Sequence, residues 1–141
     1  MLLHNASIGL VLAMALANVS VAQDTLSGPR IHFGSLIHDY DTIPFGSDGR
    51  CSFMFTNTGD APLVISTFRS SCGCLVPDWD REPVMPGTSG TVRLKYDTLR
   101  EGPFTKSATL HSNAVDAPVQ VLRIKGYVSP RNDPEGSKAR W

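Results

Sequence analysis

Cys51-Ser52-Phe53-Met54-Phe55-Thr56 places Cys51, Phe53 and Phe55 on one face of an extended chain and the intervening residues on the other. This period of two predicts a β-strand with one buried face. The turn-forming residues at 56–60 end the strand. The apolar run at 62–66 begins the next one with a proline at its first position, where strands tolerate proline.

Similar alternation recurs along the chain. It is clear in 92–96 and 104–110 and looser in 31–37, which is expected to form an edge strand. In 119–128 the alternation slips between Val121 and Leu122, which predicts a bulge. About seven short strands with frequent turns predict an all-β, immunoglobulin-like antiparallel β-sandwich.

Between these strands, two stretches are expected to be loops because they are rich in Asp, Pro and Gly: 39–49 and 77–90. Two other turns share one motif. The spacing Asn-x-x-Asp-Ala-Pro occurs at 57–62 and again at 113–118, each time between two strand-like runs. The same turn is therefore predicted twice.

The first part of the chain has the features of a secretory signal. Residues 8–17 form an apolar run that is too short to span a bilayer, and Ser20-Val21-Ala22 supplies small residues for cleavage after Ala22. We therefore expect residues 1–22 to be a signal peptide and the protein to be exported, either periplasmic or secreted. A flexible lead-in at 23–30 and a disordered tail at 129–141 are expected to flank the domain.

Charge and size limit the function further. The chain has thirteen Lys and Arg against thirteen Asp and Glu, so the basic excess that nucleic acids and anionic membranes attract is missing. There is no second long apolar run, and no transmembrane segment is expected. Removing the first 22 of 141 residues leaves 119, the size of one domain.

The segment Arg69-Ser70-Ser71-Cys72-Gly73-Cys74-Leu75 carries the main candidate chemistry. A bridge between Cys72 and Cys74 becomes possible if Gly73 bends the chain. Such a bridge would add only about 1.6 kcal/mol by chain entropy, whereas one from Cys51 to Cys72 would add about 3.4 kcal/mol. A bridge that mainly stabilised the fold would be the longer one, and a strained short one would suit thiol exchange. Alternatively Cys51, in phase with Phe53, is a buried, inert thiol.

Metal binding and catalysis have weaker support. Two thiolates from Cys72 and Cys74 could hold Cu(I), but His32, His38 and His111 lack the spacing that would complete a zinc site. No catalytic triad or phosphate-binding loop is present, so we expect no enzyme activity and no cofactor. Trp79 is either part of a ligand surface or a cap on the core.

Several blocks together resemble the bacterial DUF1573 family. They are FMFTNTGDAPLVI at 53–65, SCGCLVPDW at 71–79, PGTSG at 86–90, YDT at 96–98 and IKG at 124–126. The resemblance covers residues 31–128. It implies an immunoglobulin-like fold related to ASH and major-sperm-protein domains, and export to the bacterial envelope. The family's cysteine pair corresponds to Cys72 and Cys74, whereas Cys51 lies outside its pattern.

These observations favour a non-enzymatic exported binding or scaffold module of the bacterial cell envelope. Its partner is expected to be another envelope protein or a surface component, met through an exposed sheet edge or through loops. The candidate binding residues are Cys72, Gly73, Cys74 and Trp79. The alternative is a periplasmic thiol-redox or Cu(I)-handling protein that uses Cys72 and Cys74. The oligomeric state stays open.

Overall fold

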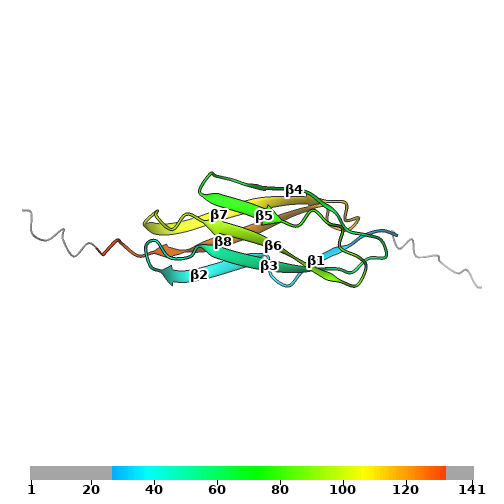
Figure 1. The fold of residues 1–141 in the computed structure, drawn as a ribbon, viewed down its shortest axis with the longest axis horizontal. Helices are drawn as coiled ribbons and strands as arrows, with labels where there is room; N and C mark the ends of the chain where they lie inside the picture. The colour runs from blue at the N-terminus through cyan, green and yellow to red at the C-terminus, as the bar shows by residue number, and fades with distance from the viewer. Residues whose placement is uncertain (1–26, 133–141) are drawn as a thin grey trace, which may run out of the picture.

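The computed structural model describes residues 27–132 and shows an elongated β-sandwich (Figure 1). Its eight strands are β1 (Ile31–Phe33), β2 (Ile37–Ile43), β3 (Arg50–Asn57), β4 (Ile65–Ser70), β5 (Leu75–Trp79), β6 (Ser89–Tyr96), β7 (Gly102–Ser112) and β8 (Val119–Val128). The predicted signal peptide, the first half of the lead-in (23–26) and the tail from 133 onward lie outside the described residues.

The strands form two four-stranded sheets, in the orders β1-β3-β6-β5 and β2-β8-β7-β4. The predicted all-β sandwich is therefore confirmed. One pair departs from the expected antiparallel arrangement, because β2 runs parallel to β8. In Figure 1 the described chain enters at one end of the sandwich (blue) and leaves at the other (orange-red).

Three local predictions were wrong. The segment 31–37 is not one strand: β1 and the start of β2 belong to different sheets. The expected loops at 39–49 and 77–90 contain most of β2 and part of β5, respectively. Both are edge strands with many exposed side chains, so their polar composition resembles that of loops. Pro77 is compatible with this position, because an edge strand has one side without a hydrogen-bonded neighbour.

The bulge predicted in β8 is also absent. The β7–β8 ladder runs from Gly102 opposite Val128 to His111 opposite Val119 without a shift in register. Leu122 is fully buried, whereas Val121 points outward and is 45% exposed. Val121 is thus an apolar residue on the outer face, and its place beside Leu122 gave the sequence the pattern of a bulge. In the ladder between β2 and β8 the irregularity lies in β2, where Asp41 has a φ of 55°.

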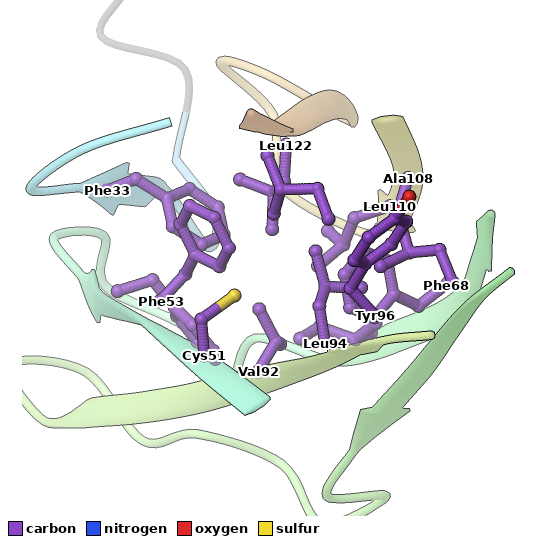
Figure 2. Packing of buried hydrophobic residues seen from close by; sticks show 14 of the residues in the cluster. Phe33, Cys51, Phe53, Phe68, Val92, Leu94, Tyr96, Ala108, Leu110 and Leu122 are labelled. Atoms are coloured by element: carbon purple, nitrogen blue, oxygen red, sulfur yellow. The ribbon is translucent and has the colours of Figure 1, made fainter. Parts of the chain in front are cut away.

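The core fills the space between the sheets with inward-facing side chains of both. Cys51, Phe53 and Phe55 are all buried, as their alternation predicted, and Figure 2 shows the Cys51 sulfur among apolar side chains. At one end of the core the Tyr96 ring stacks on Phe104 with 3.9 Å between centroids. The loops at both ends extend from the strands that this core holds together.

The two turns that share the Asn-x-x-Asp-Ala-Pro motif lie at the same end of the sandwich and hold the same segment. Asp60 accepts hydrogen bonds from the Gly28 N–H (2.6 Å) and the Ser27 hydroxyl (2.9 Å). Asp116 accepts one from the Ile31 N–H (3.2 Å). The repeated motif thus anchors the chain as it enters β1.

Candidate functional site

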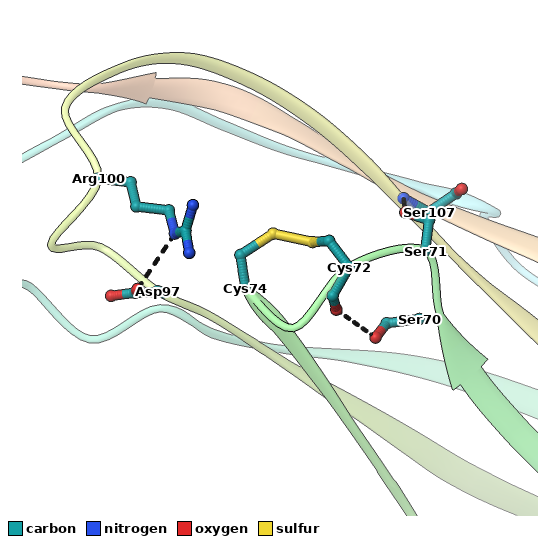
Figure 3. Close-up of a disulfide and its surroundings, with 7 residues drawn as sticks. All are labelled: Ser70, Ser71, Cys72, Cys74, Asp97, Arg100 and Ser107. Atoms are coloured by element: carbon teal, nitrogen blue, oxygen red, sulfur yellow. Dashed lines mark hydrogen bonds and ion pairs between the residues drawn. A yellow bond between two sulfur atoms is a disulfide. The ribbon is translucent and has the colours of Figure 1, made fainter.

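Cys72 and Cys74 form a disulfide in the turn that carries the chain from β4 in one sheet to β5 in the other (Figure 3). Their Cα atoms are 5.3 Å apart, within the range that a disulfide requires. Cys74 is buried, Cys72 is half-buried, and Gly73 between them is exposed. The shorter of the two bridges considered is therefore the one that forms.

Backbone hydrogen bonds on both sides hold this turn. The Asp97 N–H donates to the Cys74 carbonyl (2.8 Å), and the Ser71 N–H donates to the Ser107 carbonyl (2.9 Å). The Ser70 hydroxyl donates to the Cys72 carbonyl (2.6 Å), as Figure 3 shows. The turn is thereby tied to the loop after β6 and to β7, so the bridge sits on a well-supported frame.

Removing the bridge is expected to cost little stability. The variant Cys72→Ser/Cys74→Ser should unfold with a free energy about 1.6 kcal/mol lower, because the bridge closes a loop of only three residues. Urea denaturation of both proteins measures this difference. A loss above about 3 kcal/mol would show that the bridge constrains more than its own loop.

Trp79 lies at the far end of β5 from the disulfide. Its indole N–H donates to the Ile65 carbonyl (3.3 Å), and its ring packs edge-on against Phe68. The guanidinium of Arg81 lies over the ring, 3.4 Å from its centre. Because five residue steps of roughly 3.3 Å each separate them along the extended chain, Trp79 and Cys74 do not share one small site. The contacts of Trp79 match those of a core cap.

Cys51 is a free, buried thiol on β3. Burial raises the pKa of this thiol, and burial likewise raises the pKa of Tyr40, whose hydroxyl donates to the Gly49 carbonyl (2.6 Å). Both groups are therefore held neutral in the folded protein, which agrees with the prediction of an inert thiol.

Cys51 should resist alkylation in the native protein and react on unfolding. A raised pKa in the folded state also means that stability is complete below the thiol's unfolded pKa, about 8.5, and falls as pH rises through and above that value. Thiol counting with and without denaturant tests the first expectation, and urea midpoints between pH 7 and 10 test the second. A thiol that reacts rapidly at pH 7 in the folded protein would contradict both.

The end of the sandwich next to the disulfide has a hollow of about 420 Å³. It is lined by residues 46–50, from the loop before β3 and its first residue, and by residues 95–99, from the end of β6 and the loop after it. Leu99, on its rim, is 65% exposed. Asp97 connects the hollow to the disulfide turn, because it lines the hollow and its N–H donates to the Cys74 carbonyl. Sequence reasoning indicated a possible bridge between Cys72 and Cys74 but missed this hollow, which forms from segments distant in the chain.

A second hollow of about 250 Å³ lies on the outer face of the sheet β1-β3-β6-β5. Arg50 and Lys95 line both hollows. Within residues 27–132, no three His, Cys, Asp or Glu residues are grouped so that they could hold a metal ion. No helix in this described part of the chain is long and apolar enough to cross a membrane.

The model of a family described as "Protein of unknown function (DUF1573)" matches residues 31–128. No curated protein matches the chain. Among solved structures, a protein of unknown function from Porphyromonas gingivalis is similar, with a TM-score of 0.64 and 18% identity over 75% of this chain. The match covers 50% of that protein, so the chain spans about half its length.

Two further structures share the fold. The ASH/PapD-like domain 7 of human CEP192 has a TM-score of 0.57 at 9% identity, covering 82% of this chain and 97% of that domain. WR4, a C. elegans MSP family member, has a TM-score of 0.50 at 13% identity, covering 72% of this chain and 100% of that one. The expected relation to ASH and major-sperm-protein domains is confirmed at the level of the fold.

Proposed function

The chain belongs to the DUF1573 family, and from that premise we propose that it is an exported, non-enzymatic binding module of the bacterial cell envelope. The observation that best supports a binding role is the open end of the sandwich. There a rigid core presents a hollow of about 420 Å³, the exposed Leu99 and the disulfide turn together. Loops on such a scaffold are the usual place for partner contacts.

We place the contact surface at this end, which includes Cys72, Gly73 and Cys74 and leaves out Trp79. The disulfide limits the freedom of the turn before binding, which reduces the entropy that association costs. The partner is another envelope protein or a surface component.

Site-specific photo-crosslinking in the native bacterium tests the proposal. A photoreactive residue at Leu99 should give a discrete adduct in the envelope fraction, and one at Thr58, exposed at the other end of the sandwich, should not. Adducts from Thr58 alone would move the contact surface to the opposite end, and adducts from neither position would argue against a binding role. Cell fractionation tests export, which a cytoplasmic location would contradict.

Thiol exchange is the second candidate, and the half-buried Cys72 favours it. In this reaction a partner thiolate attacks the Cys72 sulfur, forms a mixed disulfide and releases the Cys74 thiolate. Cu(I) binding would require prior reduction, because a bridged pair offers no thiolate. Mild reductant should then open the bridge while the domain stays folded. Resistance to reduction until the domain unfolds would argue against this candidate.

A further inference from the structure

Two cations face each other on the outer surface of the sheet β1-β3-β6-β5. Arg50 on β3 is directly opposite Lys95 on β6, and like charges in this position destabilise a sheet. Within residues 27–132 Lys95 makes no ion pair, and Arg50 has one, to Asp48 at 4.0 Å. The side chains of that pair are 73% and 68% exposed, so the pair offsets little of the repulsion.

The next cation on the same face of β6 is neutralised. Arg93 forms ion pairs with Asp78 (2.8 Å) and Asp80 (3.1 Å). These two carboxylates raise the pKa of the Arg93 guanidinium further, chiefly through their hydrogen bonds. The sheet therefore supplies acidic partners for Arg93. Asp78 lines the same hollow as Lys95, but its carboxylate is paired with Arg93, and Lys95 has no ion pair of its own within the described residues. The unbalanced charge is local to the Arg50–Lys95 pair.

The surroundings of the pair indicate what could balance it. Val76 is opposite Lys95 on β5 and is 58% exposed, so an apolar side chain borders the cations in the second hollow. The hollow of about 420 Å³ at the loop end of the sandwich, which Arg50 and Lys95 also line, contains Asp48 and Asp97 as well. Of these two, Asp97 is paired with Arg100 (3.3 Å). The excess of positive charge is therefore larger over the sheet face than in the loop-end hollow. An anionic group bound over the sheet face would contact the two cations, and an aliphatic group beside it would contact Val76.

We propose that Arg50 and Lys95 form the anion-recognition position of this module, and that its partner presents an extended acidic peptide segment. A carboxylate can bind the planar guanidinium of Arg50 through two hydrogen bonds and pair with the ammonium of Lys95. Alternating side chains of an extended peptide would then reach Val76. This inference rests on the proposed binding function and names the chemistry of its partner.

The test uses a capped octapeptide of alternating Glu and Val and measures its affinity for the full chain by fluorescence anisotropy. Lys95→Gln and Arg50→Gln should each weaken binding about three- to fivefold, and binding should weaken as salt rises. Lys125→Gln is the matched control, because Lys125 lies on the other sheet and is already paired with Asp39 (3.4 Å); its affinity should stay unchanged. The counterpart peptide with Lys in place of Glu should not bind.

A second measurement separates recognition from folding. Lys95→Gln removes the repulsion in the free protein, so its thermal midpoint should rise by about 1–4 °C while its affinity falls. Unchanged affinity in both variants would overturn the proposal, as would equal binding of the Lys peptide. If inorganic phosphate displaced the labelled peptide as effectively as unlabelled peptide does, the site would bind anions in general, and the proposal of a peptide partner would be wrong. None of these outcomes bears on crosslinking at Leu99, so failure here and failure of the binding function are distinguishable.

Discussion

Replacing Asn57 with alanine is expected to lower the free energy of unfolding by about 3–4 kcal/mol. Asn57 is fully buried. Its amide group donates to the carbonyls of Ala61 (2.8 Å) and Val84 (2.9 Å) and accepts from the N–H groups of Gly59 (3.0 Å) and Arg30 (3.3 Å). Alanine would leave these backbone groups without that partner in a site from which water is excluded.

Asn113→Ala is the matched control, because Asn113 occupies the same position of the repeated motif. Its amide binds the Val64 N–H (2.7 Å) and the Pro62 carbonyl (3.1 Å), but the residue is exposed. Water can replace these bonds, so a loss of about 1 kcal/mol is expected. Urea denaturation of both variants measures the difference. Equal losses would mean that burial of the asparagine is not what makes it important.

Leu122→Ala is expected to lower the free energy of unfolding by about 3–4 kcal/mol. Leu122 is fully buried in the middle of β8, and Figure 2 shows it projecting from one sheet into the core. Truncation would remove the apolar surface that it buries and leave a cavity that the two packed sheets cannot close. Chemical denaturation with a two-state fit measures this loss.

Val121→Ala tests the register of β8 by comparison. Val121 is adjacent in sequence but points outward, so its truncation should change stability by no more than about 0.5 kcal/mol. If β8 had the bulge that its sequence pattern predicted, both residues would contribute to the core. Comparable losses for the two variants would therefore contradict the straight ladder between β7 and β8.

The fold could be predicted wherever one strand face is buried and the other is wet. Cys51, Phe53 and Phe55 show this, since their alternation located β3 and its inner face correctly. Prediction failed at the sheet edges. β5 was assigned to a loop because an edge strand is solvated on one side and can contain Pro77, so its composition does not differ from that of a loop.

The candidate site could be predicted only in part. The spacing of Cys72 and Cys74 indicated a possible bridge, but it could not decide between that bridge and one to Cys51. The structure decides it, because Cys51 is directed into the core on β3 while Cys72 lies in the turn between β4 and β5. The sequence also grouped Trp79 with the cysteines, and an extended β5 separates them.

By itself, the sequence determined which residues of β3 turn inward, that the two Asn-x-x-Asp-Ala-Pro segments are turns and that the protein is a β-sandwich. These properties depend on the alternation of neighbouring side chains and on turn chemistry, and both are local. Only the tertiary structure decided that β2 runs parallel to β8, that Arg50 faces Lys95 and that two distant loops enclose a hollow. Those features depend on which strands pair across 45 or more residues of chain. The packing free energy of the whole sandwich selects this pairing, and no short segment of the sequence indicates it.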